Sequence, residues 1–104
     1  MSGAYEHLLD GVAKVFLYVE FKTSRRGRNV VDYSVVLIVE EGGRRETVRL
    51  YDCAHGENEL HRYTRDGGNQ VAEVFNRDTL GAGMRAAIEE VERGYEAMIE
   101  AWRK

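Results

Sequence analysis

Residues 51–63, YDCAHGENELHRY, contain most of the side chains of this chain that could carry out a reaction. The segment holds two of the three histidines, His55 and His61, and the only cysteine, Cys53. Histidine changes its charge near neutral pH, so one histidine can take up a proton while a second one gives a proton away. Such a pair, with an arginine to balance charge on a pentacovalent phosphate, can cleave RNA without a metal, using the 2′-hydroxyl as nucleophile.

Two sets of residues receive roles in such an RNA-cleaving site. The expected catalytic residues, which move protons, neutralise the phosphate or support the bound nucleotide, are His55, His61, Arg62 and Tyr63. The expected substrate-binding residues, all arginines, are Arg25, Arg26, Arg28 and Arg49. His55 and His61 act as base and acid in an order that the sequence does not assign, and either Arg62 or Arg49 contacts the phosphate. We expect no metal ion and no cofactor.

Three other interpretations of residues 51–63 stay open. Histidines and acids in a hairpin loop are more often turn and hydrogen-bonding residues than catalysts. A metal site built from Asp52, Cys53, His55 and His61 would have mixed ligands without a recognised spacing. A Cys53 nucleophile activated by His55 would need a turn, because side chains two positions apart in an extended segment do not meet easily.

The segment KTSRRGR, residues 22–28, groups basic side chains without an acid. If this segment forms the tip of a hairpin, the simplest interpretation is that its basic side chains are only solvated. If it bends toward the histidine loop, it would supply the contacts to an RNA backbone that a chain of net charge −3 otherwise lacks. Overall attraction to nucleic acid is not expected from this charge.

The length of 104 residues indicates a single globular domain, residues 1–104, with one hydrophobic core. The 32 % of charged residues indicates a well-solvated surface. A lone cysteine excludes an internal disulfide, and no C-x-x-C spacing is present. No apolar run is long enough to cross a membrane, and the first residues lack the order of a signal peptide. We therefore expect a cytoplasmic protein that is not associated with a membrane.

Alternating apolar residues predict about five antiparallel strands in a meander. The expected strands cover residues 12–22, 30–41, 44–52, 59–64 and 70–75. One or two helical turns are expected over residues 3–9. Gly42-Gly43 and Gly67-Gly68 predict two tight hairpins between successive strands.

If each glycine pair alone forms its loop, the register of both hairpins follows. In the first hairpin the opposed pairs are Glu41–Arg44, Glu40–Arg45, Leu37–Val48, Val35–Leu50 and Tyr33–Asp52. This register places Arg49 and Tyr51 on the other face. In the second hairpin the opposed pairs are Arg62–Glu73, Leu60–Phe75, His61–Val74 and Tyr63–Ala72. His61 and Tyr63 then share one face, while His55 lies in the loop.

Near the C-terminus the apolar spacing changes to that of a helix. The apolar stripe consists of Leu80, Met84, Ile88, Val91, Tyr95, Met98 and Trp102. Asp78 or Thr79 is a suitable N-cap. The expected fold is therefore α+β, an antiparallel meander sheet packed against one long C-terminal amphipathic helix. Alternatively, the last turns of the helix, with Met98 and Trp102, form part of a homodimer interface.

The stretch VRLYDCAHGENELHRYT, followed by a strand and a single helix, resembles the TumE-type toxins of bacterial toxin–antitoxin modules. The resemblance lies in Asp52, Ala54, His55, Gly56 and His61, and in the upstream segments SRRGR and DYSV. It covers about half of the chain. It implies a growth-inhibiting, RNA-directed protein that is neutralised by a small DNA-binding antitoxin.

This chain departs from the family pattern at two positions and in one element. Cys53 stands where an asparagine usually follows the aspartate, and Glu59 stands where the pattern has the first histidine of His-x-His. The second departure removes one candidate acid–base group. The C-terminal helix is also longer than in those toxins.

Two functions from different classes follow from the sequence. The first is a metal-independent endoribonuclease toxin with RNA as substrate and an antitoxin as partner. The second is a non-catalytic module that binds a protein partner or a second copy of itself through its helix or an exposed sheet face.

Overall fold

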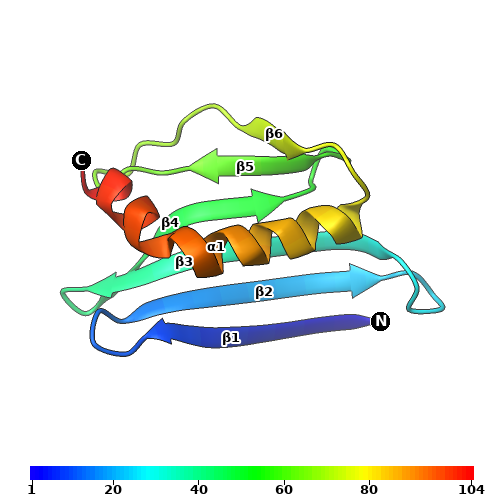
Figure 1. Ribbon diagram of the computed structural model, residues 1–104, viewed down its shortest axis with the longest axis horizontal. Coiled ribbons are helices and arrows are strands. Elements are labelled where there is room, and N and C mark those ends of the chain that lie inside the picture. Colours follow the sequence, from blue (N-terminus) through cyan, green and yellow to red (C-terminus); the bar gives the residue numbers. More distant parts are fainter.

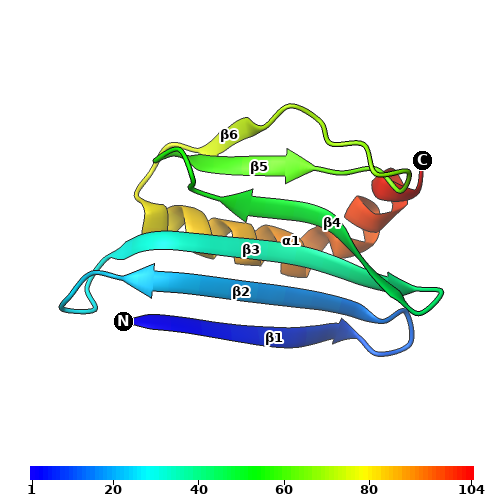
Figure 2. The ribbon, with the colours of Figure 1, turned by 180° about the vertical axis from the view of Figure 1, so that it is seen from behind.

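The computed structural model describes residues 1–104 and consists of one antiparallel sheet crossed on one face by a single helix (Figure 1). The six strands are β1 (Ser2–Asp10), β2 (Val15–Thr23), β3 (Val30–Glu41), β4 (Arg44–Asp52), β5 (Asn58–Arg62) and β6 (Glu73–Asn76). Each strand pairs with its neighbours in the chain, and α1 (Leu80–Arg103) follows the last strand. The expected α+β meander is confirmed, with one strand more than predicted. Seen from behind, the other face of the sheet is covered by no element (Figure 2).

The hydrophobic core lies between α1 and the middle of the sheet. Alternate residues of the central strands β2 and β3 point toward the helix, as the period of two requires. The sheet side of the core is formed mainly by Val15, Leu17, Val19, Tyr33, Val35, Leu37 and Val39. The buried helix residues are Gly83, Ala87, Val91, Met98, Ile99 and Trp102. Met98 and Trp102 are therefore packed against the chain's own sheet and present little surface to a second copy.

Ion pairs fasten the end of α1 to the β3–β4 hairpin. The Glu41 carboxylate binds the guanidinium of Arg103, and its other oxygen lies 3.2 Å from the guanidinium of Arg65. The N–H of Arg65 also donates to the carbonyl of Trp102 at 2.8 Å.

α1 is not apolar enough over a sufficient length to cross a bilayer.

The prediction of helical turns over residues 3–9 is wrong, because these residues belong to β1. β1 pairs along its length with β2, from Ser2 opposite Lys22 to Leu8 opposite Phe16. So short a helix is marginal in water. As a strand, the segment instead satisfies the backbone groups along the edge of β2.

The register of the β3–β4 hairpin agrees with the prediction only near the turn. Glu41 pairs with Arg44, and Glu40 with Arg45, as expected. Beyond them a bulge at Val48 shifts the pairing by one residue. The bulged strand can then bury both Val48 and Tyr51 against the helix, which a regular strand would place on opposite faces.

This bulge corrects the predicted position of several side chains. Val35 pairs with Tyr51, and Ser34 pairs with Asp52. Tyr51 is fully buried in the core instead of facing away from it. Asp52, as its neighbour in the strand, points to the open face of the sheet.

The predicted register of the second hairpin is also wrong, although the predicted Arg62–Glu73 ion pair is present at 2.5 Å. Leu60 pairs with Glu73 instead of Phe75. The turn is longer than the two glycines, because the N–H of Thr64 donates to the carbonyl of Gly68 at 2.9 Å. Phe75 packs edge-on against Tyr51, with ring centroids 5.0 Å apart.

A buried asparagine, Asn58, joins the sheet to the start of the helix. Its side-chain oxygen accepts a 2.6 Å hydrogen bond from the Tyr33 hydroxyl. Its amide nitrogen donates to the carbonyls of Asp78 and Thr79, at 3.1 and 3.2 Å. The Thr79 side chain then caps the helix by accepting from the N–H of Ala82, as predicted from its type and position.

Gly83 is the helix residue that lies over Asn58. A Cβ at this position would be 2.0 Å from the side-chain oxygen of Asn58, so only glycine fits unless Asn58 moves. Burial raises the pKa of Tyr33, which keeps its hydroxyl protonated and able to donate to Asn58. Nothing in the sequence pattern indicated this contact.

We expect Gly83→Ala to destabilise the protein, although alanine usually stabilises a helix by about 1 kcal/mol relative to glycine. The new methyl group would displace the Asn58 side chain, and each buried polar group left unpaired costs about 1–3 kcal/mol. Urea unfolding should therefore show a loss of about 2 kcal/mol or more.

Gly94→Ala is the matched control in the same helix. A Cβ at Gly94 meets only the end of the Met98 side chain, at an ordinary 3.5 Å, so this change should be neutral or stabilising by up to about 1 kcal/mol. Equal stability of the two variants would contradict the role of Gly83.

Candidate functional site

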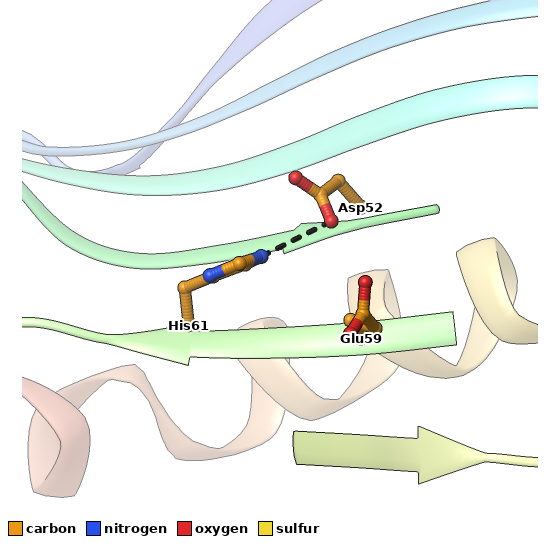
Figure 3. Close-up of side chains that lie close together, drawn as sticks. All are labelled: Asp52, Glu59 and His61. Carbon is orange, nitrogen blue, oxygen red and sulfur yellow. Dashed lines mark hydrogen bonds and ion pairs between the residues drawn. The ribbon is translucent and has the colours of Figure 1, made fainter. Parts of the chain in front are cut away.

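Three polar side chains meet on the open face of the sheet, where β4 ends and β5 begins (Figure 3). Asp52, the last residue of β4, pairs directly with Glu59 of β5. His61 lies two residues beyond Glu59 and therefore on the same face. Its Nε2 is 3.2 Å from Oδ1 of Asp52. All three side chains are mostly covered, with exposed fractions of 17 % for Asp52, 14 % for Glu59 and 18 % for His61.

His55 reaches this cluster from the loop between β4 and β5. Gly56 adopts a φ of +81°, which L side chains rarely adopt, and its N–H donates to the Cys53 carbonyl at 2.9 Å. The resulting tight turn brings His55 Nδ1 to 2.7 Å from Oε1 of Glu59. The His55 side chain is 76 % exposed. The two predicted catalytic histidines thus each contact a carboxylate, and the two carboxylates belong to residues that pair directly across β4 and β5.

The two carboxylates stand directly opposite each other on neighbouring strands. Like charges in this position repel, and their low exposure limits screening by water. Each carboxylate has one histidine as its hydrogen-bond partner: His61 contacts Asp52, and His55 contacts Glu59. The hydrogen bond and the charge of Glu59, with a smaller contribution from Asp52, raise the pKa of His55.

An apolar row crosses the open face and ends at the site. Successive strand pairings place Tyr18 beside Val36, Val36 beside Leu50, and Leu50 beside His61. No other element covers this row (Figure 2). Farther along the same face, Arg45 lies over the Phe16 ring at 4.3 Å and covers part of it. The site is therefore flanked by an uncovered apolar surface.

Three of the predicted site residues lie away from the histidines. Arg62 alternates with His61 along β5 and binds Glu73. Tyr63 packs against the hydrophobic core instead of sharing a face with His61. Arg49 pairs with the core residue Leu37 on the helix side of the sheet. None of the three is therefore positioned to contact a phosphate held by the two histidines.

Arg49 instead lies beside a buried phenol. Burial raises the pKa of Tyr51 to about 12, and neighbouring Arg49 opposes this rise. The Tyr51 hydroxyl has no hydrogen-bond partner. This group lies on the helix side and is separated from the histidine cluster by the sheet.

The other predicted substrate-binding residues, Arg25, Arg26 and Arg28, are exposed in the loop between β2 and β3. In the antiparallel meander β2 and β4 run in the same direction. The loops that follow them, the basic loop and the His55 loop, therefore lie at the same end of the sheet (Figure 1). The start of β3 contacts the His55 loop, where Cys53 Sγ lies 3.6 Å from Oδ1 of Asp32. The basic loop therefore lies at the same end of the molecule as the His55 loop, but its arginines form no hydrogen bond or ion pair with the histidines.

Cys53 does not belong to the histidine cluster. It is buried and directed toward Asp32, so it is absent from the group of potential ligands formed by Asp52, Glu59 and His61. Burial also raises the pKa of its thiol, which disfavours the nucleophilic thiolate. The prediction of a mixed site with Cys53 therefore lacks support, and Glu59 takes the place of the cysteine.

Glu59 belongs to the site although it is not among the site residues predicted from the sequence. The signal was present, because Glu59 and His61 are two apart and must share a face of any strand that contains both. What the sequence did not show is that Asp52 lies directly opposite Glu59, since the β3–β4 bulge decides which face Asp52 takes.

We expect an NMR titration of His55 to give a pKa above the ordinary value of about 6.5, because Glu59 favours the imidazolium form. Glu59→Gln should move this pKa back toward 6.5. Since the pKa is raised in the folded state, the ion pair stabilises the fold fully below pH ~6.5, and this contribution is lost as the pH rises through the folded-state pKa.

Glu57→Gln serves as the control for this titration. Glu57 is an exposed acid of the same loop and does not bind His55, so its replacement should change the His55 pKa much less than Glu59→Gln. Equal shifts in the two variants would show that the Glu59 contact does not control His55.

Comparisons with protein-family models, curated proteins and solved structures give no match to this chain. Membership of the TumE-type toxin family therefore stays a prediction that rests on the sequence pattern around residues 49–63. The two histidine–carboxylate pairs are the structural feature that bears most directly on function.

Proposed function

We propose that the protein is the toxin of a toxin–antitoxin module and cleaves RNA by metal-independent acid–base catalysis at the His55 and His61 pairs. The observation that carries this proposal is the adjacent placement of His61 on Asp52 and His55 on Glu59, on a sheet face that no element covers. Each carboxylate holds its histidine in a defined orientation and stabilises the imidazolium that forms during proton transfer.

The reaction requires two proton transfers and no external nucleophile. One histidine removes the proton of a ribose 2′-hydroxyl, and the 2′-oxygen forms a bond to the adjacent phosphorus. The bond from phosphorus to the 5′-oxygen breaks, and the second histidine, as imidazolium, donates a proton to this leaving oxygen. The products are a 2′,3′-cyclic phosphate and a free 5′-hydroxyl. A positioned acid or base typically contributes 10²–10⁴-fold to the rate.

The phosphate must be attracted in spite of the two carboxylates. Arg62 and Arg49 are held elsewhere, by Glu73 and beside Tyr51, so the proposal assigns this role to the basic β2–β3 loop. Arg25, Arg26 and Arg28 lie at the same end of the sheet and are free to follow an RNA backbone. Phosphate contacts of this kind position RNA without reading its sequence.

The proposal includes a cytoplasmic location and a small antitoxin with a DNA-binding domain as partner. Such an antitoxin would neutralise the toxin most directly by covering the open sheet face, because this face carries both histidine pairs. The apolar row of Tyr18, Val36 and Leu50 offers the protein contact that this requires.

The test is cleavage of a short labelled single-stranded RNA by the purified protein in the presence of EDTA. Wild-type protein should produce a 2′,3′-cyclic phosphate terminus, and an oligonucleotide with 2′-deoxyribose at the cleaved position should resist. His61→Ala should lower the rate about 10²-fold or more and should abolish growth inhibition when the gene is expressed.

His7→Ala is the matched control, because His7 lies on β1, exposed and far across the sheet from the site. It should leave cleavage and growth inhibition unchanged. A His61→Ala protein with a wild-type circular dichroism spectrum and undiminished toxicity would refute the assignment.

The uncovered apolar row on the sheet favours a second candidate, a non-catalytic module that binds a protein partner or a second copy. In this case the interface is the open face and not the helix, because Met98 and Trp102 are buried within the chain. The protein would then show no RNA cleavage and would form a dimer or complex that Val36→Glu disrupts. A monomer at high concentration without a co-purifying protein would contradict this candidate.

A further inference from the structure

We propose that Asp52, Glu59 and His61 form a binding site for one divalent transition-metal ion of the Zn²⁺ type. The three residues provide two carboxylate oxygens and one imidazole nitrogen, all within 4.8 Å of one another. Metal binding itself does not depend on the proposed ribonuclease activity. Its effect on that activity, described below, does.

The distances are close to those of a metal site. Ligand atoms bound to one Zn²⁺ at about 2.0–2.2 Å in tetrahedral geometry lie about 3.3 Å apart. His61 Nε2 and Asp52 Oδ1 are already 3.2 Å apart. The carboxylate of Glu59 points into the same space, so a small rotation of this side chain completes the set (Figure 3).

The ligands are also held in place before any ion arrives. Asp52 and Glu59 are directly paired residues of two hydrogen-bonded strands, and His61 is fixed two positions along β5. Sites on paired strands are positioned more accurately than sites on loops, and binding then orders little additional chain. No ligand comes from the exposed loop.

The charge of the cluster favours a cation. Two mostly covered carboxylates face each other, and neither of them forms an ion pair with a lysine or an arginine. A divalent ion between the carboxylates would replace their repulsion by attraction. The cluster is therefore more than a group of exposed acids, since its side chains are covered and one ligand is an imidazole.

The ligand types select the metal. Imidazole suits Zn²⁺, and three protein ligands leave the fourth position of Zn²⁺ for water. Mg²⁺ and Ca²⁺ prefer oxygen ligands and a larger coordination number, so they should bind weakly. The thiol of Cys53 is directed to Asp32 and is not a ligand.

His55 has a separate role in this site. Its Nδ1 binds Oε1 of Glu59, which leaves the other carboxylate oxygen for the metal. Hydrogen bonds from outside the ligand set orient metal-binding carboxylates, and their loss typically weakens metal binding by 10–100-fold. We therefore assign His55 as a positioning residue of the metal site.

Metal binding would switch off the proposed cleavage. Neutral imidazole has one free lone pair, and a metal on Nε2 of His61 would occupy it and leave a hydrogen on Nδ1. His61 could then neither take up a proton nor lose one in the reaction. Zn²⁺ would act as a reversible inhibitor of the metal-independent ribonuclease.

The test is isothermal titration of the metal-free full chain with ZnCl₂ and, separately, with MgCl₂. We expect one Zn²⁺ per chain and Mg²⁺ binding at least 100-fold weaker. Glu59→Gln and His61→Gln should each weaken Zn²⁺ binding at least 10-fold, whereas Glu57→Gln and His7→Ala should bind like the wild type.

A thermal melt of each protein with and without Zn²⁺ tests folding and binding together. Zn²⁺ should raise Tm for the wild type and for the two control variants, and this shift should be clearly smaller in Glu59→Gln and His61→Gln at the same Zn²⁺ concentration. Absence of a single-site Zn²⁺ isotherm in the folded wild type, or unchanged binding in both ligand variants, would overturn the metal site.

The cleavage assay separates this inference from the proposed function. Inhibition by Zn²⁺ that EDTA reverses would support both. Zn²⁺ binding without any RNA cleavage would refute the ribonuclease and leave the metal site standing. Cleavage that requires Zn²⁺ would refute the metal-independent mechanism and the inhibitory role, while the site itself would stand.

Discussion

The side chain of Asn58 is the contact on which the arrangement of sheet and helix depends. A helix laid on a sheet by apolar contacts alone could slide, because hydrophobic packing has little directionality. Asn58 removes this freedom by binding the Tyr33 hydroxyl on one side and two carbonyls just before α1 on the other. Its polar atoms are buried and must be satisfied, so the position of the helix start is fixed to within hydrogen-bond tolerance.

The same asparagine connects the fold to the candidate site. Asn58 and Glu59 are consecutive in β5, and consecutive side chains of a strand point to opposite faces. Anchoring Asn58 beneath the helix therefore holds Glu59 on the open face opposite Asp52. The bulge at Val48 has the same effect in β4, because it places Tyr51 on the helix side of the sheet and Asp52 on the open face. One buried contact and one strand irregularity thus position the two carboxylates.

Much of the fold could be predicted from periodicity. The alternation in β2 and β3, the turn at Gly42-Gly43 and the stripe and cap of α1 are local patterns, and the structure contains all of them. The bulge at Val48 could not be predicted, because it accompanies the burial of both Val48 and Tyr51 against the helix, which is a tertiary contact and not a local pattern. β1 was missed for a similar reason, since its strand conformation depends on pairing with β2.

The sequence indicated that histidines would form the candidate site, but it did not indicate which other residues lie beside them. His55 and His61 were selected because imidazole chemistry is recognisable from sequence. Arg62, Tyr63 and Arg49 were selected because they are near in sequence, and the two faces of the sheet separate them from the histidines. Glu59 was passed over because its importance comes from its partner across the strands.

The direct pairing of Asp52 with Glu59 has a consequence for how this protein could vary in evolution. The pairing is maintained by the backbone ladder between β4 and β5, so the carboxylates do not depend on the residues of the intervening loop. Insertions or replacements in that loop would remove or relocate His55 while leaving the other three side chains undisturbed. Related proteins could thus differ in the length of this loop and in the residue that contacts Glu59, while Asp52, Glu59 and His61 stay the same. A survey of such variants would reveal whether His55 or the three strand residues are essential.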